Sequence, residues 1–170
     1  MRVIFWGPVL AWLCVIAIGS SGAGRSDNSR SLIVRFLDRT SPETAATLTP
    51  YQIDCLNYAA RKTAHIVEFA VLGLLLLRGF QRGSTRLRLG ALSLATVTAG
   101  LGGALDELHQ MAVGGRTPLL SDVLIDLSGA AVAIGAASLW FVIKALERKL
   151  AGPADNGTDP ARASRPSRRS

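Results

Sequence analysis

Ionisable residues at helical spacing are the first feature of this sequence that could do chemistry. Arg61, His65, Glu68 and Leu72 recur at steps of four, three and four, which places them on one face of a helix. A histidine and a glutamate on one helical face can act in proton transfer or as nitrogen and oxygen ligands to a divalent cation. The HxxE spacing permits a metal site without specifying one, because no HExxH or CxxC element accompanies it.

Two further segments carry polar residues at the same kind of spacing. One contains ALDELHQ, with Asp106, Glu107, His109 and Gln110 following the small residues Ala95, Ala99 and Gly102. The other places Asp122 and Asp126 on a face with Gly129, Ala133 and Ala137. Small residues at such spacing allow helices to approach closely. We therefore expect the three polar stripes to face one another.

The elements that carry these stripes are predicted to cross a membrane. Hydrophobic residues make up 49% of the 170-residue chain, and a hydrocarbon core of about 30 Å needs about 20 mostly apolar helical residues. Four segments with few charges approach that length: 3–24, 64–80, 89–105 and 123–143. The sequence thus predicts an all-α polytopic membrane protein, with a four-helix transmembrane bundle in one domain over residues 1–150. The basic tail, 151–170, is expected to be disordered.

The structure of several segments, including the first span, has more than one interpretation. The first span, with its small-residue end, also suits a cleavable secretory signal. Residues 30–39 predict either a short amphipathic helix in the outer interface or a loosely ordered loop. Thr49 and Pro50 form a helix-start signal, so the second span is expected to begin well outside the hydrocarbon. Cys14 lies within the first predicted span and Cys55 in the outer loop, so we expect no intrachain disulfide between them.

The distribution of Lys and Arg predicts the orientation. Twelve of the 19 basic residues fall on one side if the N-terminus is cytoplasmic, and the short flanks between the second and third spans are especially Arg-rich. Both termini are therefore expected in the cytoplasm. The net charge of +7 is explained by this asymmetry and by attraction to anionic lipid, so we expect no nucleic-acid partner.

Ionisable groups then gather at the outer boundary of the spans. A charge at the centre of a bilayer costs at least about 2.5 kcal/mol, so such groups normally face protein or water and find partners. One interpretation is a polar clamp that only fixes the bundle, and the alternatives are functional sites. The cluster contains the cations Arg61, Lys62 and Arg116, the carboxylates Glu68, Asp106, Glu107, Asp122 and Asp126, and the imidazoles His65 and His109.

These residues resemble the VanZ-like family of integral membrane proteins. The resemblance covers roughly residues 5–145 and depends on RKTAHIVEFAVLGLLL followed by DELHQMAVGGRTPLLSDVLIDLSGAAVAIG. Two positions depart from the family pattern: Phe69 stands where Tyr is common, and Gly114 where Pro is usual. The resemblance implies a set of family residues, namely Lys62, His65, Glu68, Asp106, Glu107, Gln110, Arg116, Asp122, Asp126 and Gly129.

The resemblance implies a bacterial plasma-membrane location and an association with resistance to glycopeptides such as teicoplanin. It transfers no agreed mechanism, so three functions remain open. The first is a cell-envelope protein that binds an anionic lipid or lipid-linked cell-wall intermediate at the outer face. Its ligand-binding candidates are Arg61, Lys62, Glu107, Gln110, Arg116, Asp122 and Asp126.

The second function is a membrane-embedded hydrolase or transferase acting at the outer leaflet, with His65, Glu68 and Asp106 as its catalytic candidates. A divalent metal is the cofactor that these residue types would suit, and its candidate ligands are His65, Glu68, Asp106, His109 and Asp122. The third is a proton-coupled carrier, for which four short spans offer little room. The small-residue faces could also serve a homodimer, although packing within one bundle is the simpler use.

Overall fold

The computed structural model describes residues 2–21, 26–114, 117 and 119–151, and every regular element in these ranges is an α-helix. The order is α1 (Arg2–Gly19), α2 (Ser26–Thr40), α3 (Pro42–Thr47), α4 (Pro50–Gln81), α5 (Leu89–Gly114) and α6 (Leu120–Leu150). The predicted basic tail lies outside the described residues, apart from Ala151. The all-α prediction is confirmed.

Helices α4, α5 and α6 are each long and apolar enough to cross a membrane, and α1 is a shorter apolar helix. Their outer surfaces expose large apolar side chains, including Val97, Leu101, Val132 and Leu139. Such surfaces suit contact with lipid. At 1.5 Å per residue the 18-residue α1 is about 27 Å long, close to the thickness of the hydrocarbon. The helices thus form the predicted membrane bundle.

Helix α1 ends at Gly19, short of the predicted limit at residue 24. Gly19, Ser20 and Ser21 are poor helix formers, and the Ser21 hydroxyl donates a 2.6 Å hydrogen bond to the carbonyl of Ile18. Helix α5 instead continues nine residues past its predicted end at residue 105. The DELHQ segment, in which the helix was expected to end, therefore lies within α5, and the helix continues for four residues beyond it.

The first turn of α4 confirms the helix start expected at Thr49 and Pro50. The Thr49 hydroxyl accepts a hydrogen bond from the Gln52 backbone N–H, and the Gln52 side chain accepts one from the Thr49 N–H. This capping box satisfies two backbone donors. Helix α4 then runs for 32 residues, about 48 Å, so it exceeds the hydrocarbon thickness by several turns.

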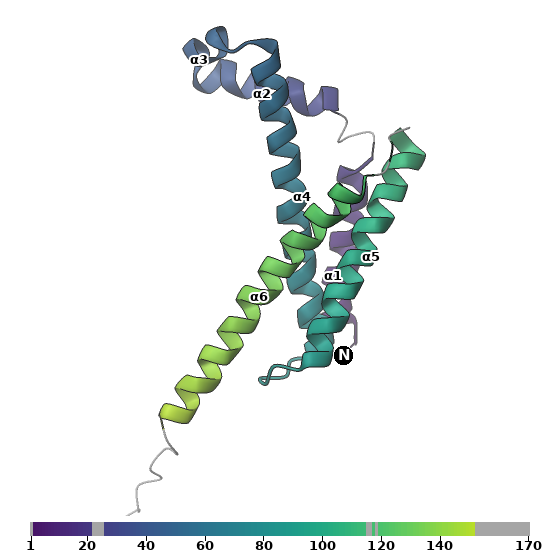
Figure 1. Cartoon of the computed structure of the whole chain (residues 1–170), viewed down its shortest axis with the longest axis vertical. Helices are drawn as coiled ribbons and strands as arrows, with labels where there is room; N and C mark the ends of the chain where they lie inside the picture. Colours follow the sequence, from purple (N-terminus) through teal and green to yellow (C-terminus); the bar gives the residue numbers. More distant parts are fainter. Residues whose placement is uncertain (1, 22–25, 115–116, 118, 152–170) are drawn as a thin grey trace, which may run out of the picture.

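The two ends of the bundle differ in what they carry (Figure 1). Helices α2 and α3, the C-terminal end of α5 and the start of α6 lie at one end, which we call the α2–α3 end. The connection between α4 and α5 and the C-terminal end of α6 lie at the other, the α4–α5 end. The stretch predicted as an interfacial helix or a loop is helical, and Leu32 and Phe36 of α2 are exposed.

Close contacts between α4, α5 and α6 hold the bundle together. Ala95 and Ala99 of α5 and Ala130 of α6 are completely buried beside Phe69 and Leu72 of α4. The tightest approach is at Gly129, where an added Cβ would lie 2.3 Å from the Ile66 carbonyl oxygen. The small-residue stripes thus face the core, and they bring the polar residues at their ends together.

Candidate functional site

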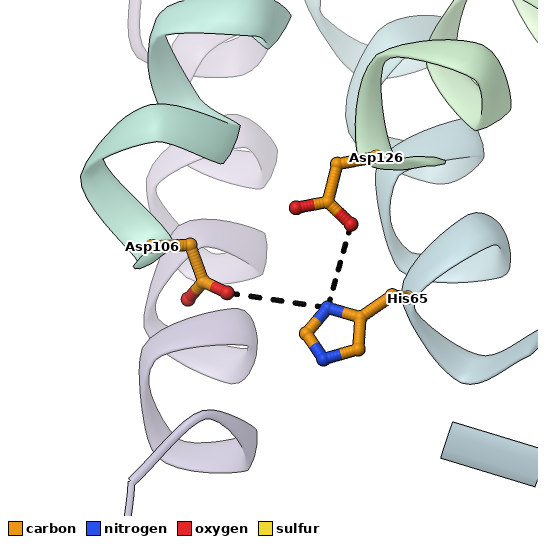
Figure 2. A group of neighbouring side chains, drawn as sticks. All are labelled: His65, Asp106 and Asp126. Atoms are coloured by element: carbon orange, nitrogen blue, oxygen red, sulfur yellow. Dashed lines mark ion pairs between the residues drawn. The ribbon is translucent and has the colours of Figure 1, made fainter. Parts of the chain in front are cut away.

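Three side chains from three helices meet near the α2–α3 end. Figure 2 shows the His65 ring of α4 with one nitrogen directed towards both Asp106 of α5 and Asp126 of α6. His65 Nδ1 lies 3.5 Å from Asp126 Oδ1 and 3.9 Å from Asp106 Oδ2. Both distances exceed the 2.7–3.2 Å of an ordinary N–H···O hydrogen bond. The three groups are gathered without being closely bonded to one another.

Asp126 is the most deeply buried of the three, with 2% of its surface exposed. Its Oδ2 atom has no hydrogen-bond partner in the described structure. A Cβ at Gly103 would lie 3.2 Å from Asp126 Cβ, so the small residue on α5 makes room for the carboxylate. A buried carboxylate oxygen without a partner is costly, so this position favours a cation or a hydrogen-bond donor as its partner.

Asp106 is positioned by its own helix. Gln110, one turn later on α5, donates a 2.7 Å buried hydrogen bond from Nε2 to Asp106 Oδ2. This bond fixes the oxygen that faces His65. Gln110 therefore acts as a positioning residue within the cluster.

The atoms of this trio are spaced nearly as ligands to one ion. One ligand atom each from His65, Asp106 and Asp126 lies within 4.8 Å of the other two. Two ligands about 2.1 Å from a tetrahedral ion are about 3.4 Å apart, so the most widely separated pair of the trio would have to approach by up to about 1.4 Å. One imidazole nitrogen and two carboxylate oxygens suit zinc or another divalent first-row metal.

An ion pair lies beside the trio and also joins α4 to α6. Lys62 Nζ is 2.6 Å from Asp122 Oδ1, and both side chains are largely buried. Lys62 is therefore already neutralised by a neighbouring helix. Arg61 also takes part in polar interactions of its own.

Glu107 connects the end of α5 to the start of α6. Its Oε2 atom accepts a 3.0 Å hydrogen bond from the backbone N–H of Leu119, the residue that precedes α6. Leu119 has no side chain able to cap the helix, so the carboxylate takes that role from another helix. Glu107 is thus held in a structural contact rather than in the trio.

The remaining candidates are not members of the trio, although Glu68 is close enough to interact electrostatically with all three of its side chains. Glu68 is half-buried on the α1 side of α4, with Oε1 3.5 Å from where a Gly19 Cβ would be. His109 has a buried Nε2 without a hydrogen-bond partner and is not among the clustered residues. Asp122 pairs with Lys62, and Arg116 lies outside the described residues. Of the five metal candidates, the described cluster contains His65 and Asp106, and it adds Asp126.

One contact of α4 was not anticipated from the sequence. Trp12 of α1 donates a 2.8 Å hydrogen bond from Nε1 to the backbone carbonyl of Glu68. The sequence signal for this contact is the presence of a Trp in an apolar span, because a buried indole N–H needs a hydrogen-bond acceptor. This bond fixes α1 against α4 one turn below His65.

Comparison with known proteins identifies a family for this chain. The family model described as VanZ/LLP1 matches residues 5–141 of the chain, which include the whole of the trio. The chain has no significant match among curated proteins or among solved structures.

Proposed function

Since the chain belongs to the VanZ/LLP1 family, we propose that it is a cell-envelope protein that binds headgroups of lipids or lipid-linked cell-wall intermediates through a divalent cation. The cation would be held by His65, Asp106 and Asp126. The observation that carries this proposal is the meeting of these three groups from three helices, with a buried carboxylate oxygen of Asp126 left without a partner.

The charges around the trio favour a cation as the first ligand. In the part of the cluster that the structure describes, five carboxylates accompany two basic residues and two imidazoles. Lys62 is already paired with Asp122, so it does not offer a free positive charge to a phosphate. An anionic headgroup would meet excess negative charge here unless a metal ion lay between them. The proposal thus joins the anionic-headgroup and metal hypotheses in one site.

The depth of the trio suits a ligand that approaches from the membrane surface. His65 precedes the end of α4 by 16 residues, about 24 Å along the helix. If Gln81 lies at one boundary of a 30 Å hydrocarbon core, His65 lies within about 6 Å of the other. The bias of Lys and Arg towards the α4–α5 end supports an outer position for the trio, in a bacterial plasma membrane with both termini cytoplasmic.

Metal analysis tests the site directly. The purified protein would be equilibrated with Zn²⁺ or Mn²⁺, desalted, and its bound metal measured by elemental analysis. We expect about one ion per chain in the wild type and at least a tenfold loss of affinity in Asp126→Asn. Asp54→Asn is the matched control, because Asp54 is an exposed residue of α4 that pairs with Arg30. Wild-type protein without stoichiometric metal, or equal binding by Asp126→Asn, would refute the metal site.

Binding of a lipid headgroup at the trio is tested by a separate measurement. Native mass spectrometry with phosphatidylglycerol would count lipids retained with and without EDTA. We expect a lipid that is lost both on chelation and in Asp126→Asn. Retention that neither treatment alters would argue against headgroup binding at the trio. Teicoplanin susceptibility of cells with and without the gene then tests the resistance association.

A hydrolase is the second candidate, and the orientation of His65 favours it. Its ring is partly exposed, and Nε2 points away from both carboxylates (Figure 2). A nitrogen so placed could accept a proton from water or from a substrate hydroxyl. Release of inorganic phosphate from a lipid phosphate by the wild type, and its abolition in folded His65→Ala, would establish this activity.

A further inference from the structure

A second site lies at the opposite end of the bundle, away from the trio. A cavity of about 210 Å³ opens between the last turns of α4, the turn that follows them and the C-terminal half of α6. Its apolar wall contains Leu74, Leu77, Ala137 and Phe141, and Gln81 and Ser84 lie at its polar edge. Figure 1 shows that α6 diverges from α4 towards this end. The cavity occupies the wedge between them.

Gln81 supplies the evidence that something polar belongs in this cavity. Its residue surface is only 3% exposed, yet neither Nε2 nor Oε1 has a hydrogen-bond partner in the described structure. A buried amide normally has its donors and its acceptor satisfied. A partner for the Gln81 amide must therefore carry both hydrogen-bonding groups and an apolar group, because the rest of the cavity wall is hydrocarbon.

The charged residues around the cavity favour a negatively charged partner for Gln81. Basic residues crowd this end, and among the described residues here Glu147 is the only carboxylate, already paired with Lys144. Arg78 borders the cavity, and it also donates to the Ile4 carbonyl and lies over the Phe5 ring. The other cations are Arg82, Arg86, Arg88, Arg148 and Lys149.

We propose that this cavity binds an anionic membrane phospholipid from the leaflet at the α4–α5 end. One acyl chain lies against Leu74, Leu77 and Phe141, the Gln81 amide bonds the ester or glycerol region, and the headgroup meets the surrounding arginines. Apolar cavities of about 150 Å³ already accept a small hydrocarbon, so 210 Å³ accommodates part of one chain but not a whole lipid. The remainder of the lipid stays in the bilayer. This site is independent of the function proposed for the trio.

A matched pair of substitutions on α6 tests the site. Ala137 lines the cavity, whereas its neighbour Ala136 is exposed on another face of the helix. Native mass spectrometry in EDTA would count phosphatidylglycerol and phosphatidylcholine retained by the wild type, Ala137→Phe, Ala136→Phe and Gln81→Leu. EDTA removes any metal-dependent lipid from the trio, so the two sites are measured separately.

We expect the wild type and Ala136→Phe to retain one phosphatidylglycerol per chain, preferred over phosphatidylcholine by about tenfold, as one or two basic residues near the headgroup would produce. Ala137→Phe fills the cavity and should lose the lipid. Gln81→Leu, which keeps the shape of the wall, should weaken its retention and provides a second variant if Ala137→Phe misfolds. Undiminished retention in folded Ala137→Phe or in Gln81→Leu, or equal retention of the two lipids, would overturn the proposal.

Discussion

At the residue scale, the ion pair of Lys62 with Asp122 is the shortest charged contact between helices near the trio. Both side chains are about four-fifths buried, so either charge left alone would be poorly solvated. The effect of this pair on stability should therefore depend on both partners being present.

A double-mutant cycle measures that dependence. Lys62→Met and Asp122→Asn should each lower the free energy of unfolding in mild detergent, and the double variant should lose less than their sum. We expect a coupling energy of about 0.5–3 kcal/mol, the range for residues in direct contact. Strictly additive losses would mean that the two residues do not stabilise each other in the membrane protein.

The residue stripes were predictable from the sequence, but the composition of the trio was not. His65 and Glu68 share a face by spacing, yet three residues turn a helix by about 300°, so they differ by about 60° around its axis. That difference directs His65 towards α5 and α6 and places the Glu68 carboxylate beside Gly19 of α1, still within electrostatic range of the trio. Asp126 joins the trio because α6 crosses α4 at Gly129. The rotation of α6 about its own axis at this crossing cannot be deduced from a single sequence.

At the element scale, the crossing of α4 and α6 depends on the absence of a side chain at position 129. Gly129→Ala would place a Cβ 2.3 Å from the Ile66 carbonyl, so the helices must separate. We expect a loss of about 1–3 kcal/mol in unfolding free energy and weaker metal binding by the trio. Gly135→Ala on the same helix is the control, since its Cβ would meet nothing within 4 Å. Equal stability of the two variants would contradict the tight crossing.

The start of α6 makes a second prediction, about Glu107. Glu107→Ala removes the acceptor for the Leu119 N–H and should cost about 0.5–2 kcal/mol, as loss of a helix cap does. Glu107→Gln keeps an oxygen at the same position and should recover most of that stability. Thermal unfolding in detergent would compare the three proteins. If Glu107→Gln were as unstable as Glu107→Ala, the negative charge rather than the hydrogen bond would be responsible.

The existence of the helices was predictable from hydropathy, and the start of α4 was predictable from its capping residues. The exact ends of the helices were not predictable. The sequence indicates a helix that ends in the polar DELHQ segment, but α5 continues four residues past it, and within it Asp106 and Gln110 face inward and bond each other. The divergence of α6 was also beyond prediction. It comes from the tilted packing of α6 on α4, which approach most closely where Gly129 meets Ile66 and where Gly73 meets Ala130.

At the scale of the whole molecule, the orientation in the membrane is open to chemical labelling. Cys55 is an exposed thiol on the part of α4 that projects past the hydrocarbon, and Cys14 can be removed by Cys14→Ser. With both termini cytoplasmic, a membrane-impermeant maleimide added to intact cells should label Cys55. In a Cys14→Ser, Cys55→Ser background, Thr85→Cys at the α4–α5 end should react only after permeabilisation. The reverse pattern would invert the proposed topology.

The position of the trio near one end of the bundle bears on how the chain enters the membrane during synthesis. Asp106 lies near the end of α5 and Asp126 near the start of α6, so each helix can insert with its carboxylate still close to interfacial water. The three polar groups need to leave that water only when the preformed helices associate. Because α6 is the last of these helices to be made, the site is assembled only after translation of the bundle is complete.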